Sequence, residues 1–114
     1  MKKFETLEKA KILARDLYKI AKALPQEENY VLKSQIMRCA VSIVSNLAEG
    51  RQRTEKEFVR FIRDTRGSIS EVIVQLELVK DFYPEIQNIP ESLDKCEELL
   101  RMTYGLIGAI NNEE

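Results

Sequence analysis

The chain has 114 residues, of which 44% are hydrophobic and 32% are charged, and its formal net charge is −1 at pH 7. These values are typical of one soluble domain with one hydrophobic core, so we expect residues 1–114 to form a single domain. The sequence contains no histidine, which excludes Ser-His-Asp and Cys-His catalysis and the Glu-x-x-His pairs of di-iron helical bundles.

The three prolines, Pro25, Pro84 and Pro90, all fall between segments in which apolar residues recur at helical spacing. This pattern predicts long helices and an all-α fold. The first helix is predicted over about residues 6–23. Its apolar stripe, which suits packing against another helix, consists of Leu7, Ala10, Leu13, Ala14, Leu17, Ile20, Ala21 and Leu24. Ile12 lies on the opposite side, where it is either a lone exposed residue, the commoner case, or a subunit contact.

The second helix is predicted to begin near residue 30 or 31 and to run to Glu49. Gly50 follows it, and we expect this glycine to take the left-handed conformation just past the helix end. The polar residues Ser42, Ser45 and Asn46 interrupt the apolar pattern. We expect their side chains to bond backbone carbonyls or a neighbouring helix, and a functional role is the alternative.

A capping box is predicted at Thr54 and Glu57. The Thr54 hydroxyl can accept a hydrogen bond from the backbone N–H of Glu57, whose carboxylate can accept one from the backbone N–H of Thr54. The third helix is therefore predicted from Glu55 to about Phe82. Its core-facing residues are Phe58, Phe61, Ile62, Thr65, Ile69, Val72, Ile73, Leu76 and Val79. Gly67 lies inside this helix and is expected to permit a close helix crossing or a local bend.

Basic residues gather on the face of the third helix opposite the core and just before the helix begins. This basic stripe consists of Arg53, Lys56, Arg60 and Arg63. Residues 33–66 carry eight basic and four acidic side chains, a net +4, whereas residues 67–114 carry three and ten, a net −7. The basic stripe can bind a phosphate backbone through ion pairing and counterion release. The alternative is a solvated face balanced by partners four residues apart, such as Arg60 with Asp64.

The fourth helix is predicted from about Pro90 to the end of the chain, because proline is favoured in the first turn of a helix. Its stripe consists of Leu93, Cys96, Leu100, Thr103, Ile107 and Ile110. Four amphipathic helices with short links predict an antiparallel up-down-up-down four-helix bundle. Cys39 and Cys96 both occupy apolar helical positions without CxxC spacing, so we interpret them as small buried hydrophobic residues and not as a redox pair.

No pattern in the sequence indicates a catalytic, metal-binding or phosphate-loop site. Glu71 and Glu77 are six residues apart and do not share a helix face, and neither a GxxxxGK[ST] nor a GxGxxG phosphate loop is present. We therefore expect no catalytic residue, no metal site, no cofactor and no enzymatic activity. No apolar run approaches the roughly 20 residues that span a bilayer, and the first residues lack a signal peptide's apolar region. We therefore expect a cytoplasmic protein without a membrane partner.

The sequence resembles the four-helix-bundle proteins encoded in intervening sequences of bacterial 23S rRNA genes, over nearly the whole chain. The family pattern is S-N-x-A-E-G followed by G-S-x-x-E. The matching residues are Gln35, Arg38, Ser42, residues 45–50, residues 58–61, Gly67, Ser68 and Glu71. The resemblance implies an antiparallel bundle that assembles into a homo-oligomeric ring, a pentamer, without known enzymatic activity.

The chain is also similar to the accessory subunit of diversity-generating retroelements, a basic ring that associates with a reverse transcriptase and nucleic acid. Our chain departs from that subunit because it is slightly acidic, so nucleic-acid binding depends on the basic stripe. The resemblance implies that the motif residues tie the corner between the second and third helices together or line a subunit interface, in preference to a ligand site. These residues are Asn46, Glu49, Gly50, Gly67, Ser68 and Glu71.

Glu49 can pair with Arg38, Arg53 or Arg66, and the sequence does not select among them. We expect a homo-oligomeric binding or scaffold module with RNA, DNA or a nucleic-acid enzyme as partner. The first alternative is a protein-only scaffold whose acidic C-terminal half meets a basic partner. The second is an enzyme that uses Glu49 or Glu71 as an acid or base in a cleft between subunits.

Overall fold

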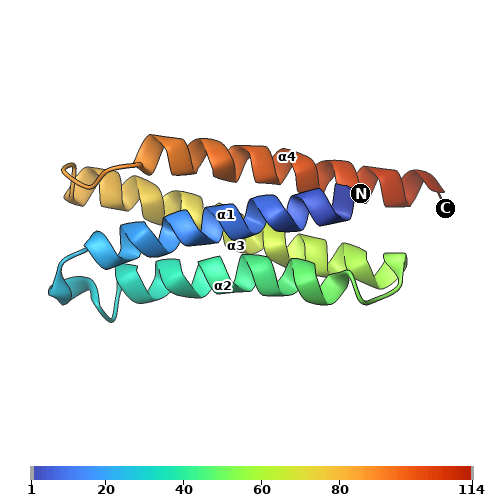
Figure 1. The fold of residues 1–114 in the computed structure, drawn as a ribbon, viewed down its shortest axis with the longest axis horizontal. Helices are drawn as coiled ribbons and strands as arrows, with labels where there is room; N and C mark the ends of the chain where they lie inside the picture. Colours follow the sequence, from blue (N-terminus) through green and yellow to red (C-terminus); the bar gives the residue numbers. More distant parts are fainter. Residues whose placement is uncertain (1, 114) are drawn as a thin grey trace.

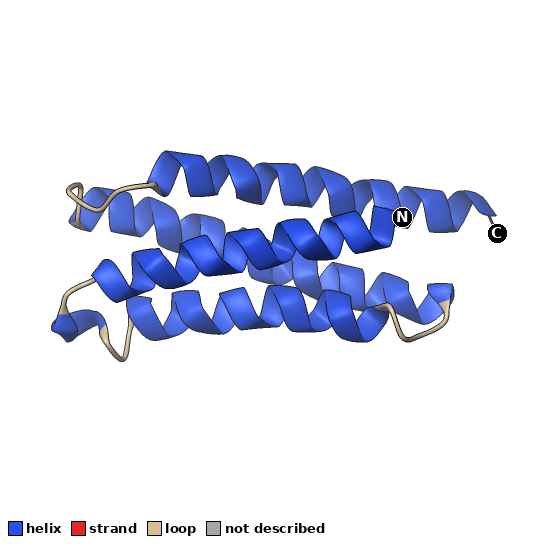
Figure 2. Ribbon diagram, viewed as in Figure 1, coloured by secondary structure: helices blue, strands red, loops and turns tan. Residues whose placement is uncertain are grey.

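The computed structural model describes residues 2–113 and places them in four long helices. The helices are α1 (Lys2–Ala23), α2 (Leu32–Gly50), α3 (Glu55–Phe82) and α4 (Ile89–Glu113), and a short 3₁₀ helix, η1 (Gln26–Glu28), links α1 to α2. Successive helices run in opposite directions along the bundle (Figure 1). Figure 2 shows helices and loops without a strand in this part of the chain. The prediction of an all-α antiparallel bundle is confirmed.

Each helix packs against two others, so that the four surround one core. The pairs in contact are α1 with α2, α2 with α3, α3 with α4 and α4 with α1, and the bundle measures 48 × 22 × 18 Å. Among residues 2–113, no helix is long and apolar enough to cross a membrane. The elongated shape gives the molecule two separate ends, and the loop between α2 and α3 lies at the same end as the start of α1 (Figure 1).

The apolar stripes predicted on the first and third helices form this core. On α1 the predicted stripe is buried except for Ala14, which is half-buried, and on α3 the only exception is Ile73. The stripe predicted on the fourth helix was partly wrong, because Leu93, Leu100 and Ile107 are only half-buried, whereas Leu99 and Leu106, which the prediction left out, are buried.

Cys39 and Cys96 are both buried and carry free thiols. Burial raises the pKa of the Cys96 thiol to about 12, and burial also raises that of Cys39. Both thiols are therefore packing residues.

Two helix boundaries differ from the predictions. The first helix begins at Lys2, four residues earlier than predicted, because its first turn is held by contacts that periodicity does not show. The Thr6 hydroxyl donates to the Lys2 carbonyl oxygen over 2.7 Å, and Lys3 pairs with Glu55 at 3.2 Å. The second helix begins slightly late, at Leu32, and includes Gly50 as its last residue.

The expected left-handed conformation of Gly50 was wrong, since no described glycine has a positive φ. Glycine is instead required at position 50 because neighbouring side chains leave no space for a Cβ atom. A Cβ atom on it would lie 2.5 Å from Cδ1 of Phe58 and 2.8 Å from Cβ of Phe61. The close helix crossing expected at Gly67 was also wrong within this chain, because a Cβ atom there would meet nothing within 4 Å.

At the opposite end, the Tyr83 hydroxyl donates to Oε2 of Glu28 over 2.5 Å, while Oε1 of Glu28 accepts from the backbone N–H of Leu32 at 3.3 Å. This hydrogen bond, with burial and nearby carboxylates, raises the pKa of Tyr83 to about 12. The unfolded chain has a tyrosine pKa of roughly 10. Because the pKa is raised on folding, the stabilisation is fully present below pH 10 and is lost as the pH rises through 12.

We therefore expect Tyr83→Phe to lower the free energy of unfolding at pH 7, and the difference from the wild type to disappear toward pH 12. Urea unfolding of both proteins between pH 7 and 12 measures this. Tyr30→Phe is the matched control, because Tyr30 is 94% exposed and its loss of a hydroxyl should change nothing. A Tyr83→Phe effect that stays constant across this range would contradict the assignment.

Candidate functional site

The corner between α2 and α3 is fixed by the predicted capping box. The backbone N–H of Glu57 donates to the Thr54 hydroxyl over 3.2 Å, and the backbone N–H of Thr54 donates to Oε1 of Glu57 over 3.4 Å. The Thr54 hydroxyl also donates to Oε1 of Glu57 over 2.9 Å. This hydrogen bond, followed by the one from the Thr54 backbone N–H, lowers the pKa of Glu57. Since the first turn of α3 also packs on Gly50, the direction of α3 is set at its first residues.

All four residues of the basic stripe are exposed, but they differ in their partners. Arg53 donates to Oε1 of Glu49 over 2.9 Å and lies 3.9 Å from Oε2 of Glu57. Among the described residues, no ion pair is formed by Lys56, Arg60 or Arg63, so the pair of Arg60 with Asp64, which belonged to the alternative of a balanced solvated face, is absent. Three cations of the stripe are therefore free to meet an anion from solution.

Arg60 instead lies against an aromatic ring. Its guanidinium carbon is 4.9 Å from the ring centroid of Phe61, and that of Arg53 is 5.5 Å from the same centroid. Phe61 is itself buried. The two guanidinium groups therefore flank one fixed ring, which restricts where they can lie on the outer face of the corner.

The motif residues form two separate groups. Near the middle of the bundle, the hydroxyl groups of Ser42 and Ser68 are 3.0 Å apart. The Asn46 amide donates to the Ser42 carbonyl oxygen over 2.9 Å and to the Ser42 hydroxyl over 3.1 Å. Glu71 forms an ion pair with Arg38 across the same helix pair. This group joins α2 to α3 through side chains.

The second group lies at the corner and consists of Glu49 and Gly50. Of the three arginines that the sequence left open for Glu49, Arg53 is its partner. Arg38 pairs with Glu71, and Arg66 donates to the Leu100 carbonyl oxygen over 2.8 Å. Gly67, which belongs to neither group, is exposed on the outer face of α3.

Sequence reasoning missed the contribution of the first turn of α1. Phe4 is 52% exposed, and the guanidinium carbon of Arg51 lies 5.8 Å from its ring centroid. Lys3, which pairs with Glu55, also has its ammonium nitrogen 5.1 Å from the ring centroid of Phe58. The available signal was an aromatic residue just before the predicted start of the first helix, beside two lysines.

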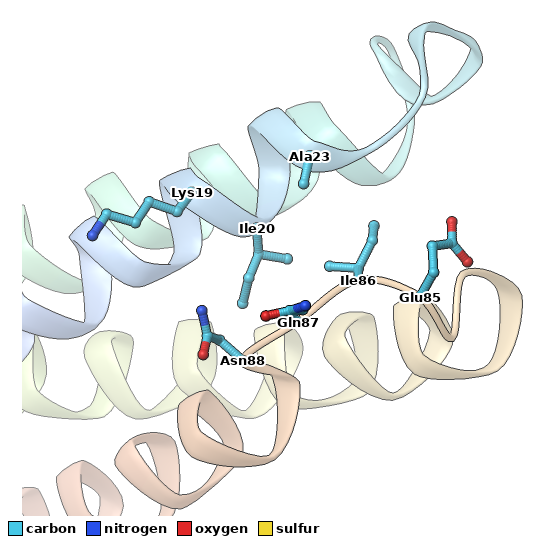
Figure 3. Close-up of a pocket in the computed structure, with 7 residues that line it drawn as sticks. All are labelled: Lys19, Ile20, Ala23, Glu85, Ile86, Gln87 and Asn88. Carbon is cyan, nitrogen blue, oxygen red and sulfur yellow. The ribbon is translucent and has the colours of Figure 1, made fainter.

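A pocket of about 350 Å³ lies at the other end of the bundle, between α1 and the loop from α3 to α4 (Figure 3). Its lining residues are Lys19, Ile20, Ala23, Glu85, Ile86, Gln87 and Asn88. Asn88 has a φ of 70°, in the left-handed region that asparagine tolerates. The pocket contains no residue of the basic stripe and no motif residue. No group of three or more cysteine, aspartate or glutamate side chains in the described part of the chain is arranged to hold a metal ion.

Comparisons with known proteins place this geometry in a family. Residues 2–105 match the family described as 23S rRNA-intervening sequence protein. The fold is similar to the crystal structure of a protein of unknown function of the S23 ribosomal protein family from Bacteroides thetaiotaomicron. That protein is 23% identical to this chain, the match covers 97% of this chain and 99% of the other, and the TM-score is 0.81. No curated protein matches the chain.

Proposed function

The chain belongs to the family of 23S rRNA-intervening sequence proteins, and from this premise we propose that it is a non-enzymatic, homo-oligomeric module of the cytoplasm that binds RNA. The observation that carries the proposal is the outer face of α3, where Lys56, Arg60 and Arg63 are exposed and have no ion-pair partner among the described residues. Such a face supports binding to phosphate groups, which both arginine and lysine recognise.

The spacing of these three residues suits a linear polyanion. At 1.5 Å per residue, Lys56, Arg60 and Arg63 lie about 6 Å and 4.5 Å apart along the axis of α3. The acidic residues are concentrated elsewhere, in residues 67–114, which carry a net −7. Residues 33–66, which include the basic stripe, carry a net +4, so local positive charge on this stripe supports binding to an anion although the net charge of the chain is −1.

The same outer face supports assembly further along α3. Successive helical residues are turned by about 100°, which puts Gly67, Val74 and Leu78 in line with Arg60. Val74 is 55% exposed and Leu78 is 37% exposed. The first half of this face is thus basic, and beyond Glu71, which pairs with Arg38, the second half is apolar. We propose that the apolar half meets another copy in a homo-oligomer, a pentameric ring, and that the basic half stays open.

A groove elsewhere on the bundle supports subunit contacts on more than one helix face. It lies between α1 and α2, has a volume of about 300 Å³ and is lined by Lys11, Ala14, Arg15, Tyr18, Ala40, Val41, Val44 and Ser45. Val41 in this groove is 51% exposed, and Ile12 on α1 is 43% exposed. A ring needs two different surfaces on each subunit, and this groove with the apolar half of α3 provides a pair.

The test is a titration of the wild-type protein with structured RNA and with single-stranded DNA over a series of salt concentrations, combined with light scattering. We expect an oligomer at micromolar concentration, and RNA binding that weakens steeply as salt rises. A monomer would overturn the assembly, and failure to bind at low salt would overturn the RNA partner.

One alternative has an observation in its favour. The net −7 of residues 67–114 suits a basic protein partner, which would make the molecule a protein-only scaffold. Capture of a partner that persists after nuclease treatment, together with no RNA binding by the purified protein, would favour this alternative.

A further inference from the structure

The first turn of α1 presents an aromatic ring at the basic end of the bundle. Phe4 is 52% exposed and does not belong to the buried core. Other exposed aromatic residues are Tyr30, Phe82 and Tyr104. Phe4 differs from Tyr30 and Phe82 in its position, because the start of α1 and the corner between α2 and α3 lie at one end of the molecule (Figure 1).

Contacts with the corner hold this turn in place. Lys3 pairs with Glu55 at 3.2 Å and lies over the ring of buried Phe58. Arg51, the residue that follows α2, has its guanidinium carbon 5.8 Å from the ring centroid of Phe4. The Arg51 guanidinium therefore lies over one face of the exposed Phe4 ring, at the end of the bundle that carries the basic stripe.

Tyr104 offers a useful comparison. The guanidinium carbon of Arg66 lies 4.4 Å from its ring centroid, and the same guanidinium is fixed by hydrogen bonds to the Leu100 carbonyl oxygen and the Thr103 hydroxyl. That cation is engaged within the protein. Arg51 has no ion-pair partner among the described residues, so its charge remains available to a phosphate beside Phe4.

We propose that the RNA bound by this protein is single-stranded, and that one of its bases stacks on Phe4 while Arg51 contacts the adjacent phosphate. This inference rests on the proposed function. An aromatic side chain can stack only on a base whose face is free, which a duplex does not offer. Aromatic rings combined with cations that follow the backbone are the general means of binding single strands without sequence preference. Phe4 supplies the aromatic ring, with Arg51 beside it for the adjacent phosphate. Lys56, Arg60 and Arg63 supply the cations that follow the backbone.

The test compares a fluorescently labelled single-stranded RNA with the same strand annealed to its complement. We expect the wild type to bind the single strand more tightly than the duplex. Phe4→Ala should weaken binding to the single strand by about 10-fold and leave binding to the duplex and the salt dependence unchanged, because stacking releases no counterions. Tyr30→Ala, at the other end of the bundle, is the matched control and should bind as the wild type does.

A second variant gives a direct signal. The chain contains no tryptophan, so Phe4→Trp introduces a single indole that should retain binding and lose fluorescence when a base stacks on it. Unchanged fluorescence on saturation, or full single-strand affinity in Phe4→Ala, would overturn the stacking contact. If the wild type binds single strand and duplex equally well, this inference alone fails. If it binds neither at low salt, the RNA part of the proposed function fails with it.

Discussion

Replacing Lys56, Arg60 and Arg63 together by glutamate is expected to weaken RNA binding by at least about 100-fold at low salt, because each loses a phosphate contact and gains a repulsion. The slope of log affinity against log salt concentration should fall by about three, or one for each cation removed. Since these side chains are exposed and form no ion pair among the described residues, the fold and the oligomer should remain intact. Filter binding over a salt series, with light scattering on the same samples, measures both.

The matched control changes the same net charge at the other end of the bundle. Lys19, Lys22 and Lys33 lie near the opposite loops and, among the described residues, form no ion pair. Their joint replacement by glutamate should leave RNA affinity within a few-fold of the wild type. Equal losses in both variants would mean that net charge decides binding, and equal retention would mean that the basic stripe is a solvated face.

The limits of α3 and α1 show what the sequence could and could not predict about the fold. Helical periodicity and the capping box gave α3 its observed limits, Glu55 and Phe82, because local signals mark both ends. The start of α1 was missed because Lys3 is held by Glu55, a partner 52 residues away in the sequence. Tertiary contacts of this kind leave no periodic pattern in the residues that make them.

The sequence could predict which charged residues belong to the candidate site, but it could not predict which side chains contact one another. The spacing of Arg60 and Asp64 permits an ion pair on a helix surface, yet Arg60 lies over Phe61, which the sequence placed only in the core. Glu49 had three possible arginine partners, and only the corner geometry selects Arg53. The position of Phe4 beside Arg51 also depends on how the helices close, so that site requires the structure.

The packing around Gly50 is another tertiary contact that the sequence pattern does not reveal. Replacing Gly50 by alanine is expected to lower the free energy of unfolding by about 1–3 kcal/mol. Alanine favours a helix over glycine by up to about 1 kcal/mol, so propensity alone predicts stabilisation. Packing opposes it, because the added Cβ atom would lie 2.5 Å from Cδ1 of Phe58. That ring is 1% exposed and has little room to move, so the clash should dominate. Urea unfolding at a fixed protein concentration measures the difference.

Gly67→Ala is the matched control, with the opposite expected sign. Its added Cβ atom meets nothing within 4 Å in the chain, so the substitution should stabilise α3 by about 0.5–1 kcal/mol. The proposed assembly adds a second readout, because Gly67 lies on the outer face in line with Val74 and Leu78. If Gly67→Ala stabilises the subunit but weakens the oligomer in light scattering, the result would indicate that another copy of the chain contacts Gly67. Equal destabilisation by Gly50→Ala and Gly67→Ala would contradict the packing argument for Gly50.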